Sequence, residues 1–95
     1  MTHEFEWDDN KAEENFRTHG VDFETATEAF RDAYGVEEPD ASMDYGEPRF
    51  KLTGRAAGSL SVVIYTERGD AIRIISARQA TRRDHDRYYR ENSQE

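Results

Sequence analysis

Four arginines in the second half of the chain have the chemistry of a phosphate-binding group. They are Arg68, Arg73, Arg78 and Arg82. A guanidinium is always charged and can make two parallel hydrogen bonds to a phosphate. Arg73 stands between two isoleucines, so in a strand its side chain points away from both, where a charge must line a groove or meet a carboxylate. We expect the four side chains to converge on one phosphate.

Proton transfer beside such a phosphate needs a side chain of another kind. Histidine exchanges a proton near neutral pH, which makes His19 and, as its alternative, His85 candidates. The place of His19 just before Gly20, at a helix C-terminus, favours a capping or packing role over proton transfer. Glu67 can act as a base beside Arg68, or it can be a solvated turn carboxylate. Arg68, Arg73, Arg78, Glu67 and His19 form the predicted catalytic set.

A second group of residues is predicted to bind phosphate or to stack on a base. It consists of Lys11, Arg82, Arg83, His85 and Tyr88. Four of the five have a structural alternative. Lys11 can pair with Asp8 or Glu14, Tyr88 can anchor the last helix in the core, and the Arg82-Arg83 pair can lie on a solvated helix face.

Structural ion pairs are also open to two of the predicted catalytic arginines. Arg73 can pair with Glu6 or Glu47, and Arg78 can pair with Glu67. The spacing of His, Asp and Glu does not resemble a metal site, and the chain has no cysteine. We therefore expect neither a metal nor another cofactor.

The charge of the chain is divided unevenly between its halves. Residues 1–47 hold fifteen acidic and three basic residues, whereas residues 48–95 hold six acidic and ten basic ones. The halves carry −12 and +4, which sum to the net charge of −8. This asymmetry suggests an anion-facing second half and an acidic first half that faces solvent or a basic partner. Two ordinary solvated surfaces would explain the charge equally well.

The first half reads as a strand, two helices and a loop. Phe5 to Trp7 alternates like a short strand, and Asp8 or Asp9 can cap a helix through Arg17 that ends at Gly20 in a left-handed conformation. Asp22 can cap a second helix, whose apolar stripe is Phe23, Ala26, Ala29 and Phe30. Glycines, a proline and acids predict a loop over residues 34–46.

The second half reads as three strands and a helix. Residues 49–53 alternate like a half-exposed strand, while residues 60–66 and 71–77 resemble strands buried on both faces. Residues 67–70 form the turn between those two, which puts Arg68 at a hairpin tip. Ser76 and Gln79 have the spacing of a capping box, so a last helix is expected from there to about Arg90, with Arg78 and Arg82 in its first turns.

These elements predict one α+β domain over residues 1–95, in the order β-α-α-β-β-β-α, with an antiparallel sheet packed by helices. Ninety-five residues fit a single domain. The first residues are acidic where a secretion signal would be basic, and the longest apolar stretch, Val62 to Tyr65, is far too short to span a bilayer. We therefore expect a cytoplasmic protein without membrane contact.

Motifs along nearly the whole chain resemble the BrnT family of toxins. The opening motif contains Phe5-Glu6-Trp7-Asp8, Lys11, Asn15, His19-Gly20-Val21, Phe23-Glu24 and Ala26. The middle motif is Gly46-Glu47-Pro48-Arg49 followed by Gly54. The closing motif is the most specific and contains Val62, Tyr65-Thr66-Glu67-Arg68-Gly69, Arg73-Ile74-Ile75-Ser76-Ala77-Arg78, Ala80, Arg82 and Tyr88.

The resemblance implies a RelE-like fold and metal-independent RNA cleavage that halts translation. It also implies a partner, the BrnA antitoxin, which binds DNA, so that the pair represses its own operon and the toxin meets DNA only through the antitoxin. The chain departs from the usual family pattern at Gln79, Asp84, His85 and Asp86, which lowers the positive charge of the last helix. These departures favour an alternative, an inactive antitoxin-binding module that acts only in repression.

The predicted antitoxin surface is the acidic first half, because a DNA-binding antitoxin is usually basic. Glu13, Glu14 and Glu28 are the residues on which this expectation rests. Sheet edges also make a toxin homodimer, or a heterotetramer with two antitoxins, plausible.

Overall fold

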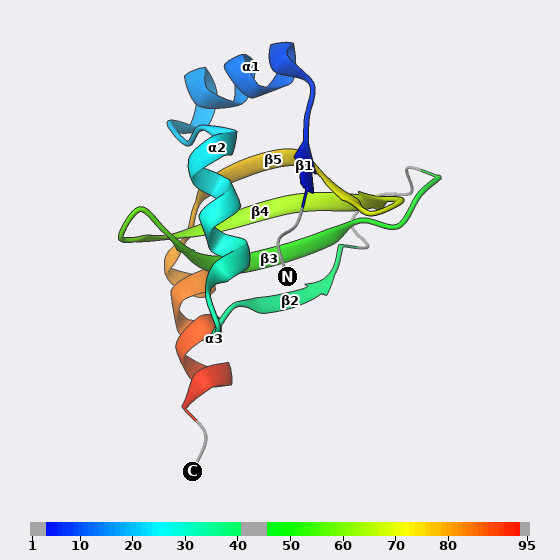
Figure 1. Ribbon diagram of the computed structural model, residues 1–95. Coiled ribbons are helices and arrows are strands. Elements are labelled where there is room, and N and C mark those ends of the chain that lie inside the picture. Colours follow the sequence, from blue (N-terminus) through cyan, green and yellow to red (C-terminus); the bar gives the residue numbers. More distant parts are fainter. Residues whose placement is uncertain (1–3, 41–45, 94–95) are drawn as a thin grey trace.

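A five-stranded sheet carries three α-helices and one 3-10 helix in the computed structural model, which describes residues 4–40 and 46–93 (Figure 1). The elements run β1 (Glu4–Glu6), α1 (Asp9–His19), α2 (Phe23–Ala26), the 3-10 helix η1 (Thr27–Arg31), β2 (Val36–Pro39), β3 (Phe50–Ala56), β4 (Ser59–Arg68), β5 (Ala71–Gln79) and α3 (Arg82–Asn92). The predicted α+β class is confirmed.

The sheet is mixed, which corrects the expectation of an antiparallel one. Its strand order is β1-β5-β4-β3-β2. The β2–β3, β3–β4 and β4–β5 pairs are antiparallel, but β1 pairs with β5 in parallel through Glu4–Ala71, Phe5–Ile72 and Glu6–Arg73. The first and last strands therefore become neighbours, and residues nearly seventy positions apart meet across them.

Both predicted helix starts in the first half are confirmed by their caps. The Asp8 carboxylate accepts hydrogen bonds from the backbone of Asn10 and Lys11, and α1 ends at Gly20 with φ of 74°. The Asp22 carboxylate accepts from the backbone of Thr25 at the start of α2. The second helix keeps its α-helical form for only four residues and then tightens into η1.

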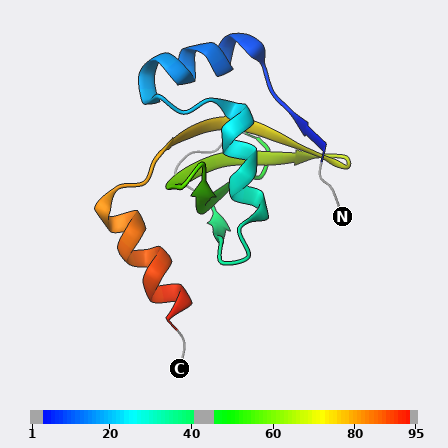
Figure 2. The ribbon, with the colours of Figure 1, turned by 60° about the vertical axis from the view of Figure 1, so that its left-hand side comes forward.

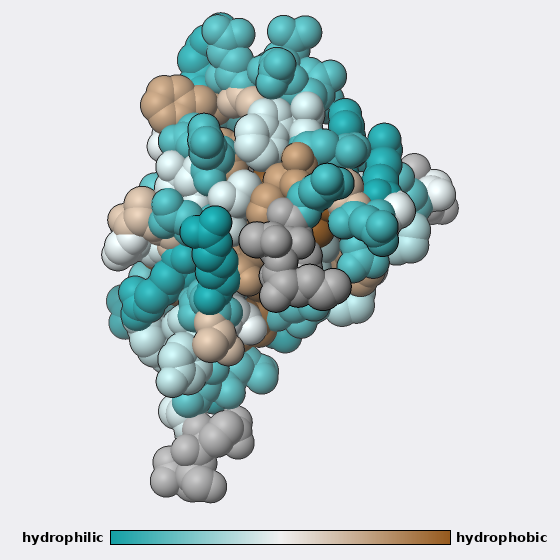
Figure 3. All heavy atoms as spheres, in the orientation of Figure 1, coloured by the Kyte–Doolittle hydropathy of each residue, from teal (hydrophilic) through white to brown (hydrophobic). Residues whose placement is uncertain are grey.

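The helices α2 and η1 pack on one face of the sheet, α1 lies along its β5 edge, and together they form the core with the sheet (Figure 1). Phe30 lies between Phe5 and Tyr65, with ring centroids 5.1 Å and 5.0 Å away. Gly54 allows the closest approach, because a Cβ there would lie 2.7 Å from the backbone oxygen of Ala29. From this side the surface is mostly hydrophilic, with hydrophobic residues visible in small patches (Figure 3).

Two expectations about element boundaries are wrong. The predicted loop over residues 34–46 contains β2, which pairs with β3; residues 41–45 lie outside the described residues. The last helix does not begin near Ser76. The strand β5 continues to Gln79, and α3 is capped by Thr81, whose capping box uses Asp84 instead of Gln79. The strand β4 is buried over most of its length, whereas β5 is fully buried only at Ile72, Ile74 and Ala77.

The helix α3 lies on the side of the sheet away from α2 (Figure 2). Only Asp84 and Tyr88 of this helix are buried. Several polar contacts hold it: Asp84 meets Lys51 and Arg78, Arg87 meets Glu38, and the Tyr88 hydroxyl donates to Asp32, just after η1, at 2.6 Å. Specific ion pairs and hydrogen bonds therefore help to place this helix.

The buried side chain of Asn15 joins α1 to β5. Its amide nitrogen donates to the carbonyls of Val21 (3.0 Å) and Ala77 (2.8 Å), and its oxygen accepts from the Ala77 backbone N–H (3.1 Å). The strand β1 pairs with β5 only as far as Arg73. The amide of Asn15 therefore satisfies the β5 edge beyond the point where strand pairing ends.

Replacing this amide should destabilise the domain strongly. In Asn15→Ala, buried backbone groups of Val21 and Ala77 lose their partners, and we expect a loss of about 3 kcal/mol in the free energy of unfolding. Urea denaturation followed by circular dichroism measures it. Asn10→Ala, an exposed change on the same helix, is the matched control. Equal stability of the two variants would contradict the role of Asn15.

Candidate functional site

The sheet face opposite α2 and η1, here called the open face, carries the cationic side chains. Along β5, Ile72 and Ile74 face the core, so Arg73 between them projects to the open face, as the alternation predicted. In β3, Leu52 belongs to the core, and Lys51 beside it projects the other way and meets Asp84 of α3 at 3.5 Å. Ordinary strand alternation therefore collects cations on one side of the sheet.

One cleft of about 200 Å³ opens on this face and is here called the hairpin cleft. It is lined by Asp8, Lys11, Glu47, Arg49, Arg68, Arg73, Ile74 and Ile75. Lys11 comes from the first turn of α1, Arg49 from just before β3, Arg68 from the end of β4 and Arg73 from β5. Four cationic side chains from four separate segments therefore border one small cavity.

Carboxylates hold two of these cations in place. The Arg73 guanidinium lies 3.1 Å from the Glu6 carboxylate, which is the first of the two pairings open to it in the sequence. Arg68 lies 3.5 Å from Glu47, and half of the Arg68 side chain is exposed. A guanidinium has five N–H donors, so one ion pair leaves donors for a second anion.

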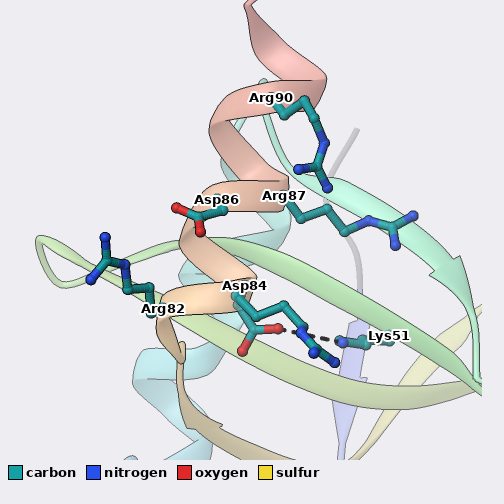
Figure 4. Close-up of a pocket in the computed structure, with 7 residues that line it drawn as sticks. Lys51, Arg82, Asp84, Asp86, Arg87 and Arg90 are labelled. Atoms are coloured by element: carbon teal, nitrogen blue, oxygen red, sulfur yellow. Dashed lines mark ion pairs between the residues drawn. The ribbon is translucent and has the colours of Figure 1, made fainter.

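A second cluster lies between α3 and strands β2 and β3 and is here called the α3 groove (Figure 4). Its volume is about 510 Å³, and its lining residues are Lys51, Arg82, Arg83, Asp84, Asp86, Arg87 and Arg90. Figure 4 shows Lys51, Arg87 and Arg90 on the side of α3 that faces the strands, and Arg82 and Asp86 on the other side.

Asp84 is the electrostatic centre of the α3 groove. Its carboxylate lies 2.8 Å from Arg78 and 3.5 Å from Lys51, and it accepts hydrogen bonds from the backbone and hydroxyl of Thr81. Partial burial acts to raise the pKa of Asp84, but the Thr81 backbone, Arg78 and the Thr81 hydroxyl outweigh it, so the pKa is well below its ordinary value. Asp84 therefore carries a negative charge that fixes α3, β3 and β5 together.

The four arginines expected at one phosphate are divided between these two clusters. Arg68 and Arg73 line the hairpin cleft with Lys11, whereas Arg82 and Arg83 line the α3 groove. Arg78 lies on β5 and not on the last helix, and it pairs with Asp84 instead of Glu67. The physical reason is that β5 continues to Gln79, so Arg78 lies in a strand where the sequence predicted a helix.

Glu67 and His19 lie away from both clusters. Glu67 precedes Arg68 in β4, so it points to the helix-covered face, where it lines another cavity with Phe30 and Tyr65. His19 ends α1, eight residues after Lys11, which is about 12 Å along the helix axis. The expected convergence of these two residues with the arginines is therefore wrong.

The aromatic and histidine residues of α3 divide in a similar way. Tyr88 is 3% exposed and donates to Asp32; burial and this hydrogen bond raise the pKa of Tyr88 to about 12. It anchors the helix, as the structural alternative proposed, and the exposed aromatic side chain is Tyr89, 48% exposed and stacked on His85. Five residues at these clusters had no predicted role in a site: Tyr89, Arg49, Lys51, Arg87 and Arg90.

The described ranges, 4–40 and 46–93, contain neither a cluster suited to a metal ion nor a helix suited to a membrane. No group of three or more His, Cys, Asp or Glu side chains within them is arranged to hold a metal ion. None of the helices in these ranges has the length and apolar character needed to cross a membrane.

The fold and the two clusters define a small α+β domain whose open face is suited to a polyanion. The family model described as the ribonuclease toxin BrnT of type II toxin–antitoxin systems matches residues 7–84. The chain belongs to this family, so it is a member of the ribonuclease toxins that have an antitoxin partner. A comparison with curated proteins gives no match. The matched range contains all the cations of the hairpin cleft and ends at Asp84, inside α3.

The low pKa of Asp84 makes its contribution to stability depend on pH. A carboxylate with a depressed pKa in the fold stabilises it above the ordinary pKa of about 4, and this stabilisation is lost as the pH falls further. We expect Asp84→Asn to be less stable than the parent chain at pH 7 and the difference to shrink below pH 4. Urea denaturation across this range measures it, and a difference independent of pH would contradict the assignment. Asp86→Asn, an exposed change on the same helix, is the control.

Proposed function

We propose that the chain is a metal-independent endoribonuclease whose hairpin cleft binds the scissile phosphate of RNA. The observation that carries this proposal is the meeting of Lys11, Arg49, Arg68 and Arg73 with the carboxylates of Asp8 and Glu47 in one cavity. A phosphate there meets fixed positive charge without any ion from solution. The family of ribonuclease toxins supplies the class of reaction.

Charge stabilisation falls to the arginines. Attack of the 2′-oxygen on the adjacent phosphorus adds a negative charge to the phosphorane, and guanidinium groups already in position stabilise that charge without reorganising. Arg68 is the more exposed of the two ion-paired arginines in the cleft and can turn from Glu47 to the phosphate. Arg73 is held more firmly by Glu6 and serves as the fixed donor.

Glu47 is the proposed base. Both cleft carboxylates can accept the 2′-OH proton, but one oxygen of Asp8 is already engaged with the backbone of Asn10 and Lys11. The partly exposed Glu47 carboxylate meets only the mobile end of Arg68 among the contacts that the structure gives it. It therefore is the cleft carboxylate better able to reach a substrate proton.

Lys11 is the proposed acid for the leaving group. As the 2′-oxygen bonds to phosphorus, the bond from phosphorus to the 5′-oxygen breaks, and that oxygen takes a proton from the ammonium group. The products are a 2′,3′-cyclic phosphate and a 5′-hydroxyl, so charge and protons balance. No step needs a Lewis acid, which is the physical basis for proposing cleavage without a metal.

The biological setting is proposed from family membership. Cleavage of cellular RNA would stop translation, and a small basic antitoxin of the BrnA type would neutralise the chain and, bound to DNA, repress the operon of the pair. The structure offers the antitoxin an exposed acidic surface on α1, where Glu13 and Glu14 face solvent. Glu28, the third residue of this prediction, also accepts from the Ala57 backbone at 2.8 Å, so changing it would disturb the β3–β4 turn.

Cleavage of a long RNA in EDTA tests the proposed activity. The parent chain should cut, and Arg68→Ala should reduce the rate by about a hundredfold or more, the size expected for the loss of one charge-stabilising donor. Gel electrophoresis of the products measures the rate, and Arg17→Ala on the outer side of α1 is the control. Glu47→Gln should also lower the rate, because an amide cannot take the proton of the 2′-hydroxyl. No cutting by the folded parent chain would favour the inactive antitoxin-binding module.

Charge reversal on α1 tests the antitoxin surface. In Glu13→Lys/Glu14→Lys, attraction to a basic partner becomes repulsion, and we expect the dissociation constant for the antitoxin encoded beside this chain to rise about tenfold, or about 1.4 kcal/mol. Titration calorimetry measures the affinity. Asp70→Lys in the β4–β5 turn, which reverses a single charge elsewhere, is the control. Unchanged affinity in the α1 variant would place the antitoxin on another surface.

A further inference from the structure

In the α3 groove, the cationic side chains outnumber the carboxylates that could pair with them. The groove and its ion-pair partners contain six cations, namely Lys51, Arg78, Arg82, Arg83, Arg87 and Arg90, against the three carboxylates of Glu38, Asp84 and Asp86. Asp84 takes Arg78 and Lys51, and Glu38 takes Arg87. Among the described residues, no carboxylate forms an ion pair with Arg82, Arg83 or Arg90.

Such an excess has an energetic cost unless an anion is bound. Like charges on one helix repel each other, and α3 places Arg83, Arg87 and Arg90 at spacings of three and four residues, where side chains are neighbours. The chain as a whole carries −8, so this local excess is not a consequence of a basic composition. An extended polyanion in the groove would offset the repulsion over its whole length.

The α3 groove and the hairpin cleft are separate cavities that lie near each other on the same face of the sheet. Arg49, in the cleft, and Lys51, in the groove, are two residues apart, which corresponds to roughly 6.6 Å along an extended chain. The register places Lys51 of β3 opposite Ile64 and Arg73 of β5 opposite Thr66, so the two cations flank β4 at positions two residues apart along it. A strand bound at the cleft can therefore pass Lys51 and reach α3.

We propose that the α3 groove binds the phosphate backbone of single-stranded RNA next to the scissile phosphate, an inference that rests on the proposed ribonuclease function. The cations supply contacts that do not depend on base identity. The stacked pair of Tyr89 and His85 lies outside the groove lining, beside Arg55, so the proposed contacts are with the phosphate backbone alone. A basic antitoxin would be repelled by the groove.

Two of the groove cations lie outside the residues that the family model matches. Arg87 and Arg90 follow Asp84, the last matched residue. The hairpin cleft lies wholly within the match, whereas the groove combines Lys51, Arg82 and Arg83 from the matched residues with Arg87 and Arg90 from beyond them. Its effect should fall on the binding of long RNA and not on the chemical step.

The salt dependence of RNA binding tests the groove. The probe is a fluorescein-labelled 2′-O-methyl RNA of twelve nucleotides, which cannot be cleaved by attack of a 2′-hydroxyl, and fluorescence anisotropy gives its dissociation constant between low and moderate KCl. For single strands the slope of log K against log salt changes by about 0.7 for each phosphate contact. Arg83→Ala/Arg90→Ala should therefore lower the slope by about 1.4.

Matched variants separate groove contacts from net charge. Arg17→Ala/Arg31→Ala removes two charges from exposed positions on α1 and η1 and should keep the slope of the parent chain. Arg83→Lys/Arg90→Lys should also keep the slope of the parent chain, because a contact with the RNA phosphate backbone needs only the positive charge. A four-nucleotide probe, too short to fill both sites, should bind the parent chain and Arg83→Ala/Arg90→Ala alike.

The outcomes distinguish this inference from the proposed activity. A reduced slope without any RNA cleavage would support the groove and overturn the ribonuclease mechanism. Cleavage with an unchanged slope in Arg83→Ala/Arg90→Ala would overturn the groove alone. An unchanged slope combined with loss of antitoxin binding in that variant would make the groove a protein interface and would equally overturn the inference.

Discussion

The hydrogen bonds of Asn15 set the relation between the first helix and the sheet on which both clusters depend. Its side chain gives the backbone of Ala77 a donor and an acceptor, as a neighbouring strand would, and also bonds Val21 at the turn into α2. Because β1 stops pairing at Arg73, the rest of the β5 edge needs another partner. The same contact fixes the orientation of α1, which brings Lys11 at its start to the cleft that Arg73 lines.

Local signals predicted most of the elements, and non-local pairing explains the errors. Aspartate caps and the left-handed Gly20 located both early helices because a cap depends on residues within one turn. The S-x-x-Q spacing at Ser76 gave a false helix start because the same kind of signal recurs at Thr81, and only the pairing of β5 with β4 selects the later one. The strand β2 carries Glu and Pro, which are rare in strands, and exists through its pairing with β3.

The site was predicted in part, because residue type is visible in the sequence but the register is not. Side chains alternate between the two faces along a strand, which correctly predicted that Arg73 points away from its neighbouring isoleucines. The same rule would have placed Glu67 and Arg68 on opposite faces. The meeting of Lys11 and Arg49 with these arginines depends on a parallel β1–β5 pair and on the register of three strands. No pattern within a short window contains that information, so the two clusters first become distinct in the fold.

The two edge strands explain how an acidic chain presents a cationic face. From β1, Glu6 reaches Arg73, and from β2, Glu38 reaches Lys51 and Arg87. Exposed ion pairs of this kind contribute little to stability, so their main effect is to fix where the cations stand. For the proposed RNA substrate, cations fixed in this way would favour the path between the hairpin cleft and α3.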